Sequence, residues 1–102
     1  MKEVTVLGVE NEELKIILSG DVDVSNADEF YAQVERAYNE AKTTIAFDCT
    51  DLAFIDSTTL GVFVKISKLT EADGNKVRLL NLQARIKKLF MICALGSRME
   101  LA

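Results

Sequence analysis

The chain has 102 residues, 49% hydrophobic and 27% charged, which predicts one folded domain covering residues 1–102. A net charge of −4 argues against nucleic acid as a partner, and no apolar run is long enough to cross a membrane, so we expect a cytoplasmic protein. Because histidine is absent, Ser-His-Asp and Cys-His hydrolytic sites are excluded. Cys49 and Cys93 show no metal-binding spacing and are expected to be buried free thiols.

The first elements form a predicted hairpin. Valines at positions 4 and 6, and less regularly at 9, alternate with polar residues, which is typical of a half-exposed strand. A tight turn at 10–12 leads into a second apolar strand over 14–18, so the two strands are expected to pair antiparallel.

A helix follows a break at 20–23. Ser25 is a candidate N-cap, and Asp28 stands three residues later as in a capping box. Apolar residues then recur at helical spacing as far as position 41. A short β-branched and apolar strand is predicted over 43–47, followed by a connecting loop over 48–57.

The next segment is ambiguous, because the valines and isoleucine of 60–66 alternate as they do in strands. A start signal at Asp56 and Ser57 and a stop at Gly74 favour a helix instead. The remaining elements are a strand over 77–80, a helix over 86–93 that Gly96 closes, and a terminal strand over 99–101.

This order, β-β-α-β-α-β-α-β, predicts an α/β fold. We expect a small mixed β-sheet in which the first strand is antiparallel and the others are parallel, with helices packed against it. Functional sites in such sheets lie at the carboxyl ends of the parallel strands. The loops over 20–24 and 48–57 should therefore emerge together, placing Asp21 or Asp23 near Ser57.

The hydroxyl of Ser57 has several possible roles. It lies at a helix start, where it is either a plain cap or a phosphorylation site, since free amides and the helix dipole stabilise an added anion. A catalytic serine is disfavoured without histidine. A Mg²⁺ site built from Asp21, Asp23, Asp48 or Asp56 is a further alternative, although aspartate is also common in turns and caps.

Three segments together resemble a known family. Residues 56–62, Asp-Ser-Thr-Thr-Leu-Gly-Val, are similar to the Asp-Ser-(Ser/Thr)-Gly-Leu-Gly-Val signature of STAS domains, specifically bacterial anti-sigma factor antagonists. Residues 20–23 resemble the segment before the first helix of that family. Residues 80–82 and 85–90, followed by Gly96, resemble its last strand-to-helix region, so the resemblance extends over most of the chain.

The resemblance implies a STAS-like fold and a non-enzymatic partner switch. In that family, the unphosphorylated antagonist binds an anti-sigma factor that is also a serine kinase, phosphorylation releases it, and a serine phosphatase restores it. Sigma-factor-dependent transcription is regulated in this way, with no cofactor or metal held by the antagonist. By resemblance Ser57 is the phosphoacceptor, and the partner-binding residues are Asp21, Asp23, Asp56, Ser57, Thr58, Thr59 and Gly61. The chain is expected to be a monomer.

Thr59 departs from the signature, which has glycine there. Its branched side chain is expected to restrict the first helical turn and add bulk to the docking face. One alternative is therefore a STAS sensing or scaffold module that phosphorylation does not control. Another is a receiver-like phosphoacceptor with Asp48 as the acceptor and Mg²⁺ held by nearby acids, although the chain is one βα unit short for that fold.

Overall fold

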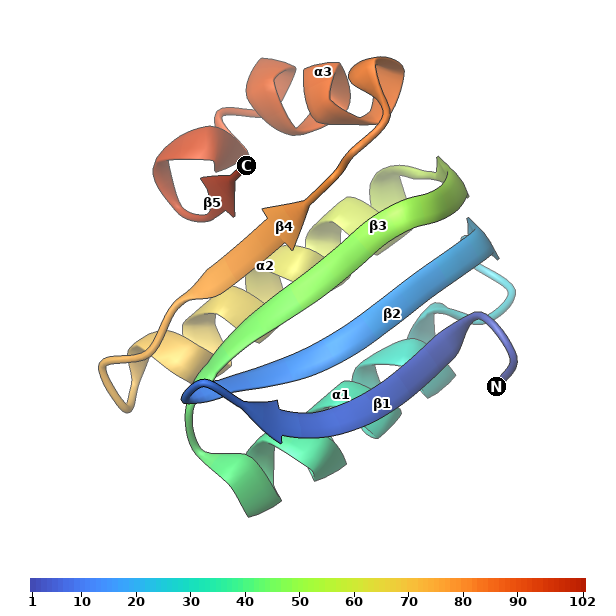
Figure 1. Cartoon of the computed structure of the whole chain (residues 1–102). Coiled ribbons are helices and arrows are strands. Elements are labelled where there is room, and N and C mark those ends of the chain that lie inside the picture. Colours follow the sequence, from blue (N-terminus) through green and yellow to red (C-terminus); the bar gives the residue numbers. More distant parts are fainter.

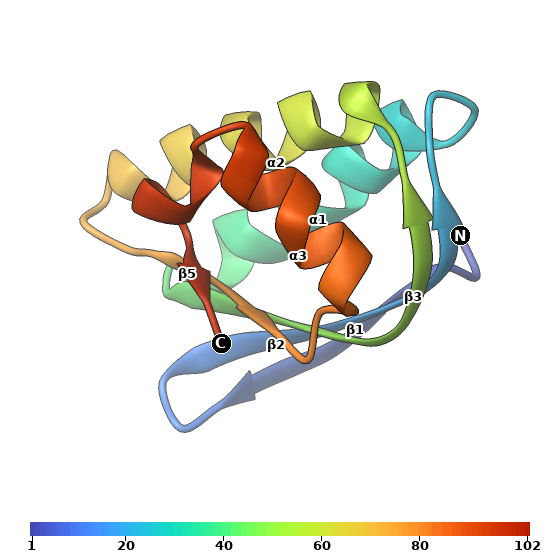
Figure 2. The same ribbon diagram turned by 90° about the horizontal axis from the view of Figure 1, so that it is seen from above.

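Five strands form a single sheet in the order β1-β2-β3-β4-β5, and the helices all lie on one of its faces (Figures 1 and 2). The computed structural model describes residues 1–102. β1 pairs antiparallel with β2, and every other pairing is parallel, so the predicted fold class is confirmed. The strands are β1 Val4–Glu10, β2 Glu13–Val22, β3 Thr44–Ile55, β4 Val77–Leu80 and β5 Glu100–Leu101. The helices are α1 Ala27–Ala41, α2 Ser57–Glu71 and α3 Ala84–Ile92, followed by a 3₁₀ turn over Leu95–Ser97.

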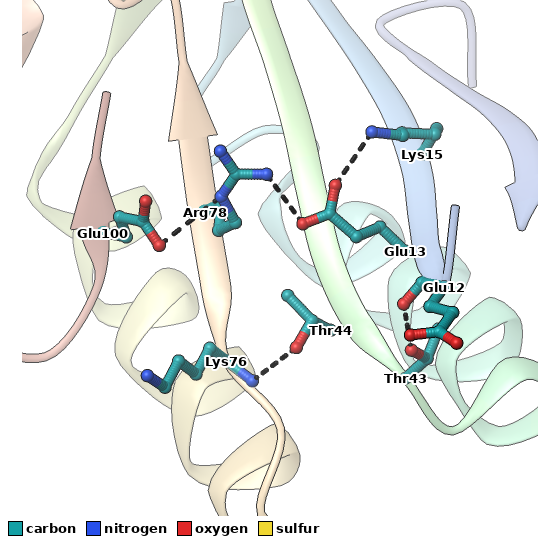
Figure 3. Close-up of polar contacts among 8 residues, drawn as sticks. All are labelled: Glu12, Glu13, Lys15, Thr43, Thr44, Lys76, Arg78 and Glu100. Atoms are coloured by element: carbon teal, nitrogen blue, oxygen red, sulfur yellow. Dashed lines mark hydrogen bonds and ion pairs between the residues drawn. The ribbon is translucent and has the colours of Figure 1, made fainter. Parts of the chain in front are cut away.

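The predicted hairpin between β1 and β2 closes with two residues in the left-handed region. Asn11 and Glu12 have φ of 54° and 64°, the pattern of a type I′ turn, which matches the twist of the paired strands. Asparagine tolerates this conformation, whereas glutamate usually does not. The carbonyl of Glu12 also accepts a hydrogen bond from the Thr43 hydroxyl, which ties the turn to the start of β3 (Figure 3).

Four phenylalanines join the sheet to all three helices. Phe47 of β3 packs edge-on against Phe30 of α1 and Phe63 of α2, with ring centroids 6.2 and 5.5 Å apart. Phe63 also contacts Phe90 of α3, at 5.3 Å. All four rings are buried within the core, so α3 is attached to the domain through the same aromatic chain as α1 and α2.

The opposite face of the sheet carries an ion-pair ladder (Figure 3). Glu13 of β2 binds Lys15 at 2.9 Å and Arg78 of β4 at 2.7 Å, and Arg78 also reaches Glu100 of β5 at 3.4 Å. The Glu13–Arg78 pair crosses β3 next to Ala46, whose small side chain leaves room for it. The hydrogen bonds from Lys15 and Arg78 hold the pKa of Glu13 below its ordinary value.

β3 is longer than predicted, because much of the expected loop over 48–57 is strand. β2 pairs with this stretch as far as Val22 opposite Ile55, with two register shifts that each add one residue on the β3 side. Asp48 and Thr50 are hydrogen-bonded to each other in this stretch. Asp48 Oδ1 accepts from the Thr50 amide at 3.1 Å and from the Thr50 hydroxyl at 2.6 Å. Polar residues that resembled a loop therefore occupy the open face of a sheet.

Two predicted helix ends are also wrong. The residue capping α1 is Asn26 rather than Ser25, whose amide and hydroxyl instead donate to Asp23 Oδ1. Helix α3 ends at Ile92, and Ala94, at φ 58°, takes the left-handed position assigned to Gly96.

The expectation of two buried thiols holds for only one cysteine. Cys49 is fully buried on β3, and Cys93, directly after α3, is exposed. Burial raises the pKa of the Cys49 thiol to about 12, which makes it a packing residue with little nucleophilic character.

Candidate functional site at the start of α2

The start of α2 lies at the edge of the sheet where β2 and β3 end side by side (Figure 1). The loop after β2 meets the first turn of α2 at this edge, which is the arrangement expected for parallel strands joined by a crossover helix. Sequence reasoning placed the two segments together, and the structure joins them through Asp56 and Thr59.

Asp56 clamps the two segments. Its Oδ1 accepts a hydrogen bond from the Thr59 amide at 2.9 Å, which makes it the N-cap of α2, while its Oδ2 accepts from the Val24 amide, also at 2.9 Å. These bonds, the one from the Thr59 amide first, lower the pKa of Asp56, so it is ionised at neutral pH. With both carboxylate oxygens engaged, Asp56 positions the loop and the helix.

The prediction that Thr59 adds bulk to the docking face is wrong. Its side chain is fully buried, and its hydroxyl lies 2.7 Å from the Val22 carbonyl and 2.9 Å from Asp56 Oδ1. Both acceptors lie within hydrogen-bond distance of the hydroxyl, which therefore contacts the end of β2 and the N-cap of α2 together. Thr59 therefore fastens α2 to the sheet and presents nothing to an incoming protein.

Ser57 and Thr58, in contrast, are both exposed in the first turn of α2. Neither hydroxyl makes a hydrogen bond within the chain, and neither residue's amide has a backbone partner. Asp56 thus satisfies the third amide of the helix and leaves the first two directed outward. The Ser57 hydroxyl is open to solvent, at the positive end of the helix dipole.

The loop after β2 holds the other predicted acids. Asp23 is half-buried, and its Oδ1 binds Ser25, whereas Asp21 is exposed. Asn26 locks this loop, because its Oδ1 accepts from the Asp23 amide at 2.9 Å and its Nδ2 donates to the Asp21 carbonyl at 3.0 Å. Sequence reasoning missed Asn26, although an asparagine closing an Asp-x-Ser-Asn run is a recognisable turn signal.

Two exposed apolar side chains lie in the segments that meet at the start of α2. Val24 is 71% exposed and Phe54 is 47% exposed, one before α1 and the other near the end of β3. Gly61 lies one turn beyond Ser57 and is also exposed, and a Cβ placed there would meet no atom within 4 Å. Sequence reasoning identified Gly61 but neither apolar residue. Both could have been recognised in the sequence, because each is an apolar residue inside a segment that was assigned to a loop.

The acids do not assemble into a metal site. No group of three or more aspartate, glutamate, cysteine or histidine side chains is close enough to hold an ion. Asp48 lies on the open face of β3, and the seven residues from it to Ile55 span roughly 20 Å of strand. The receiver-like alternative is therefore wrong, because Asp48 is remote from Asp21, Asp23 and Asp56.

Comparison with known proteins places the chain in a family. The family model described as "STAS domain" matches residues 5–102. The chain belongs to the STAS domain family. Curated relatives are the anti-sigma-B factor antagonists of Bacillus subtilis, 30% identical over 88% of this chain and 82% of the relative, and of Listeria monocytogenes, 26% identical over 90% and 81%. These names describe regulatory binding proteins and not enzymes.

Solved structures agree with this assignment. The unphosphorylated anti-sigma factor antagonist SpoIIAA is 27% identical, with a TM-score of 0.73 over 87% of this chain and 82% of that one. The Bacillus cell fate determinant SpoIIAA in its phosphorylated form is 28% identical, with a TM-score of 0.75 over 97% and 90%. The general role of anti-sigma factor antagonist is supported by these relatives. No helix of this STAS domain has both the length and the apolar character that crossing a bilayer requires.

Proposed function

We propose that this STAS domain is an anti-sigma factor antagonist switched by phosphorylation of Ser57. The unphosphorylated domain binds a cytoplasmic anti-sigma factor that is also a serine kinase, and so frees a sigma factor for transcription. Phosphorylation of Ser57 with ATP releases the domain, and a serine phosphatase reverses the change. The domain acts as a monomer, without metal, cofactor, nucleic acid or membrane.

One observation carries this proposal. The Ser57 hydroxyl is exposed and has no partner within the chain, while its neighbours Asp56 and Thr59 are fully used in holding the helix start. A serine needed only as a cap would bond to the helix amides, and here Asp56 performs that task. Ser57 is thus dispensable for the fold and available to an enzyme.

Charge provides the switching mechanism. A phosphate on Ser57 adds about −1.5 to −2 charges at neutral pH, next to the ionised Asp56 and the acidic loop of Asp21 and Asp23. The free amides of Ser57 and Thr58 can donate hydrogen bonds to an anion, so the domain stays folded when modified. A partner that buries this surface would have to desolvate the phosphate. A cost of about 3 kcal/mol weakens binding more than 100-fold.

The direct test is to incubate the purified domain with the candidate serine kinase of the same genome and ATP, and then to map the phosphosite. We expect modification at Ser57 alone, lost in Ser57→Ala and retained in Thr58→Ala, which removes a neighbouring exposed hydroxyl. An unmodified wild type, or labelling that survives Ser57→Ala, would contradict the proposal.

Binding tests the charge mechanism separately. In a titration with the kinase, Ser57→Ala should bind as the wild type does, and Ser57→Asp should bind at least about tenfold more weakly. Equal affinities for the wild type, Ser57→Ala and Ser57→Asp would favour the STAS scaffold that phosphorylation does not control. Thr59 gives no support to that alternative, because it is buried beneath the site.

A further inference from the structure

A second surface lies beside the end of β3, along the edge of that strand that β4 does not reach. β4 pairs only with residues 45–48 of β3, so the remainder of that strand faces α3 instead. Between them is a groove of about 220 Å³ lined by Ala53, Phe54, Ile55, Arg85, Ile86 and Leu89. A cavity of about 150 Å³ accommodates a benzene ring, so the groove has room for one large apolar side chain.

The groove has an apolar floor and exposed apolar rims. Ile86 and Ile55 are buried at its base, while Phe54 on one wall is 47% exposed and Leu89 on the other is 38% exposed. On α3 the apolar rim continues to Ile92, which is 69% exposed. Exposed apolar side chains that adjoin in this way are typical of surfaces that other molecules cover.

The charge around the groove is opposite to that of the whole domain. Arg85, Lys88, Leu89 and Ile92 follow one another at helical spacing along one exposed side of α3. Neither Arg85 nor Lys88 forms an ion pair, and α3 contains no acidic residue. The one contact of Arg85 is a hydrogen bond of 2.7 Å to the Ala53 carbonyl, which leaves its other N–H groups free. A domain of net charge −4 thus presents an unpaired basic rim at this groove.

We propose that this groove is a second docking site for the protein that binds at Ser57, and that it takes a segment of that partner with one bulky apolar side chain flanked by carboxylates. The apolar side chain fills the groove, and the carboxylates pair with Lys88 and Arg85. Phe54 lines the groove and lies three residues before Ser57, so both contacts fit one continuous interface. The choice of partner rests on the proposed function, whereas the chemistry of the segment rests on the groove itself.

The contacts at α2 and at α3 should respond differently to phosphorylation. Phosphate on Ser57 weakens the contact at α2, but it leaves the apolar and cationic contacts at α3 in place. A kinase held at the groove would therefore be retained weakly after phosphorylation, and its residual affinity would depend on α3.

Neighbouring lysines provide a matched pair of variants. Lys88 does not line the groove, but it lies one helical turn from Arg85, which does, whereas Lys87 lies on the other side of the helix. Lys88→Glu and Lys87→Glu therefore make the same charge reversal on two sides of α3, with both positions exposed and unpaired. In titrations with the candidate kinase, we expect Lys88→Glu and Leu89→Ala each to weaken binding about tenfold, and Lys87→Glu to stay within about twofold of the wild type. The effect of Lys88→Glu should shrink as salt is raised. Equal affinities of the two lysine variants would overturn the proposal.

A second experiment does not depend on the kinase. Two blocked peptides, one with phenylalanine between glutamates and the other with phenylalanine between lysines, are titrated against the isotope-labelled domain. We expect the acidic peptide alone to shift the NMR signals of Ala53, Phe54 and Leu89, and Lys88→Glu to abolish those shifts. No shift at the groove, or equal shifts with both peptides, would refute the site even if Ser57 proves to be the phosphoacceptor. Conversely, groove shifts in a domain that the kinase neither binds nor modifies would leave the groove valid and the proposed function wrong.

Other occupants are distinguished in the same preparation. Co-sedimentation with phosphatidylglycerol vesicles that Lys88→Glu abolishes, with kinase affinity unaffected, would show that the surface meets an anionic membrane. A mass that doubles with concentration and falls in Leu89→Ala would show that a second copy of the chain covers it. Either result overturns docking of the partner at this groove.

Discussion

The Thr59 hydroxyl lies 2.7 Å from the Val22 carbonyl, which joins the first turn of α2 to the last residue of β2 across 37 positions of sequence. Thr59, the residue that departs from the family signature, is therefore buried and holds the start of α2 against the end of β2. Because both groups are shielded from water, the bond is costly to remove.

Removing this hydroxyl should destabilise the domain. We expect Thr59→Val to lower the free energy of unfolding by about 1–2 kcal/mol, since the shape is kept and the Val22 carbonyl loses its donor. Thr59→Gly, which restores the residue of the signature, should lose still more, through lower helix propensity and the loss of a buried methyl group. Urea denaturation measures both. Thr58→Val, at an exposed hydroxyl without a partner, should stay within about 0.5 kcal/mol of the wild type, and an equal loss there would contradict the role of the buried bond.

Gly61 should separate stability from binding. It lies inside α2 with open space around its missing Cβ, so Gly61→Ala should stabilise the domain by about 0.5–1 kcal/mol in urea. We expect the same variant to bind the kinase more weakly, because a glycine at this exposed position allows close approach beside Ser57. Lys68→Ala, further along the exposed side of α2, is the control for binding. Unchanged affinity in Gly61→Ala would mean that the partner does not approach that turn.

The two cysteines should react very differently with a thiol reagent. At pH 8 the native domain should be modified at Cys93 alone, since Cys49 is inaccessible and burial raises its pKa to about 12. In denaturing urea both should react. Measuring released thiolate in the wild type and in Cys93→Ser checks this, and rapid reaction of native Cys93→Ser would contradict the burial of Cys49.

Acid should weaken the ladder on the open face of the sheet. The pKa of Glu13 is lowered in the folded state, so its contribution to stability is complete above the unfolded-state pKa of about 4.3 and disappears as pH falls through the lower folded value. We expect stability to decrease between about pH 5 and pH 2, less steeply in Glu13→Gln. Asp48, Asp56 and Asp73, whose pKa values are also lowered, account for the remaining slope.

Urea titrations across this pH range measure the effect of Glu13. Glu40→Gln is the control, because Glu40 is exposed and forms no ion pair. Its pH slope should match that of the wild type. If Glu13→Gln also matches, the ladder contributes nothing to acid stability.

Strong periodicity made the element order and pairing directions predictable. The start of α2 at Asp56 was predictable as well, because an aspartate cap before a long apolar segment is a local signal. The length of β3 was not, since Asp48 and Thr50 resemble a loop until the open face of the sheet and the pairing with β2 are known. Local signals also misassigned Thr59, whose burial depends on how α2 meets the end of β2.

Contacts distant in sequence explain the remaining errors. Ser25 is a good cap in isolation, but Asp23 competes successfully for its amide and hydroxyl. The groove beside α3 could not be predicted from the sequence, because it forms only where β3 extends beyond its pairing with β4. The placement of Ser57 in solvent was expected, and its phosphorylation stays a prediction.

The extension of β3 up to Ile55 has a mechanical consequence for Ser57. β3 ends just before Ser57, α2 begins at it, and Asp56 anchors the junction between them. The backbone around Ser57 is therefore rigid and cannot be pulled into an extended peptide conformation. Any enzyme that modifies Ser57 must accommodate the whole folded edge of the domain. Recognition of Ser57 then depends on three-dimensional shape, and a short peptide copied from residues 50–62 should be a poor substitute for the intact protein.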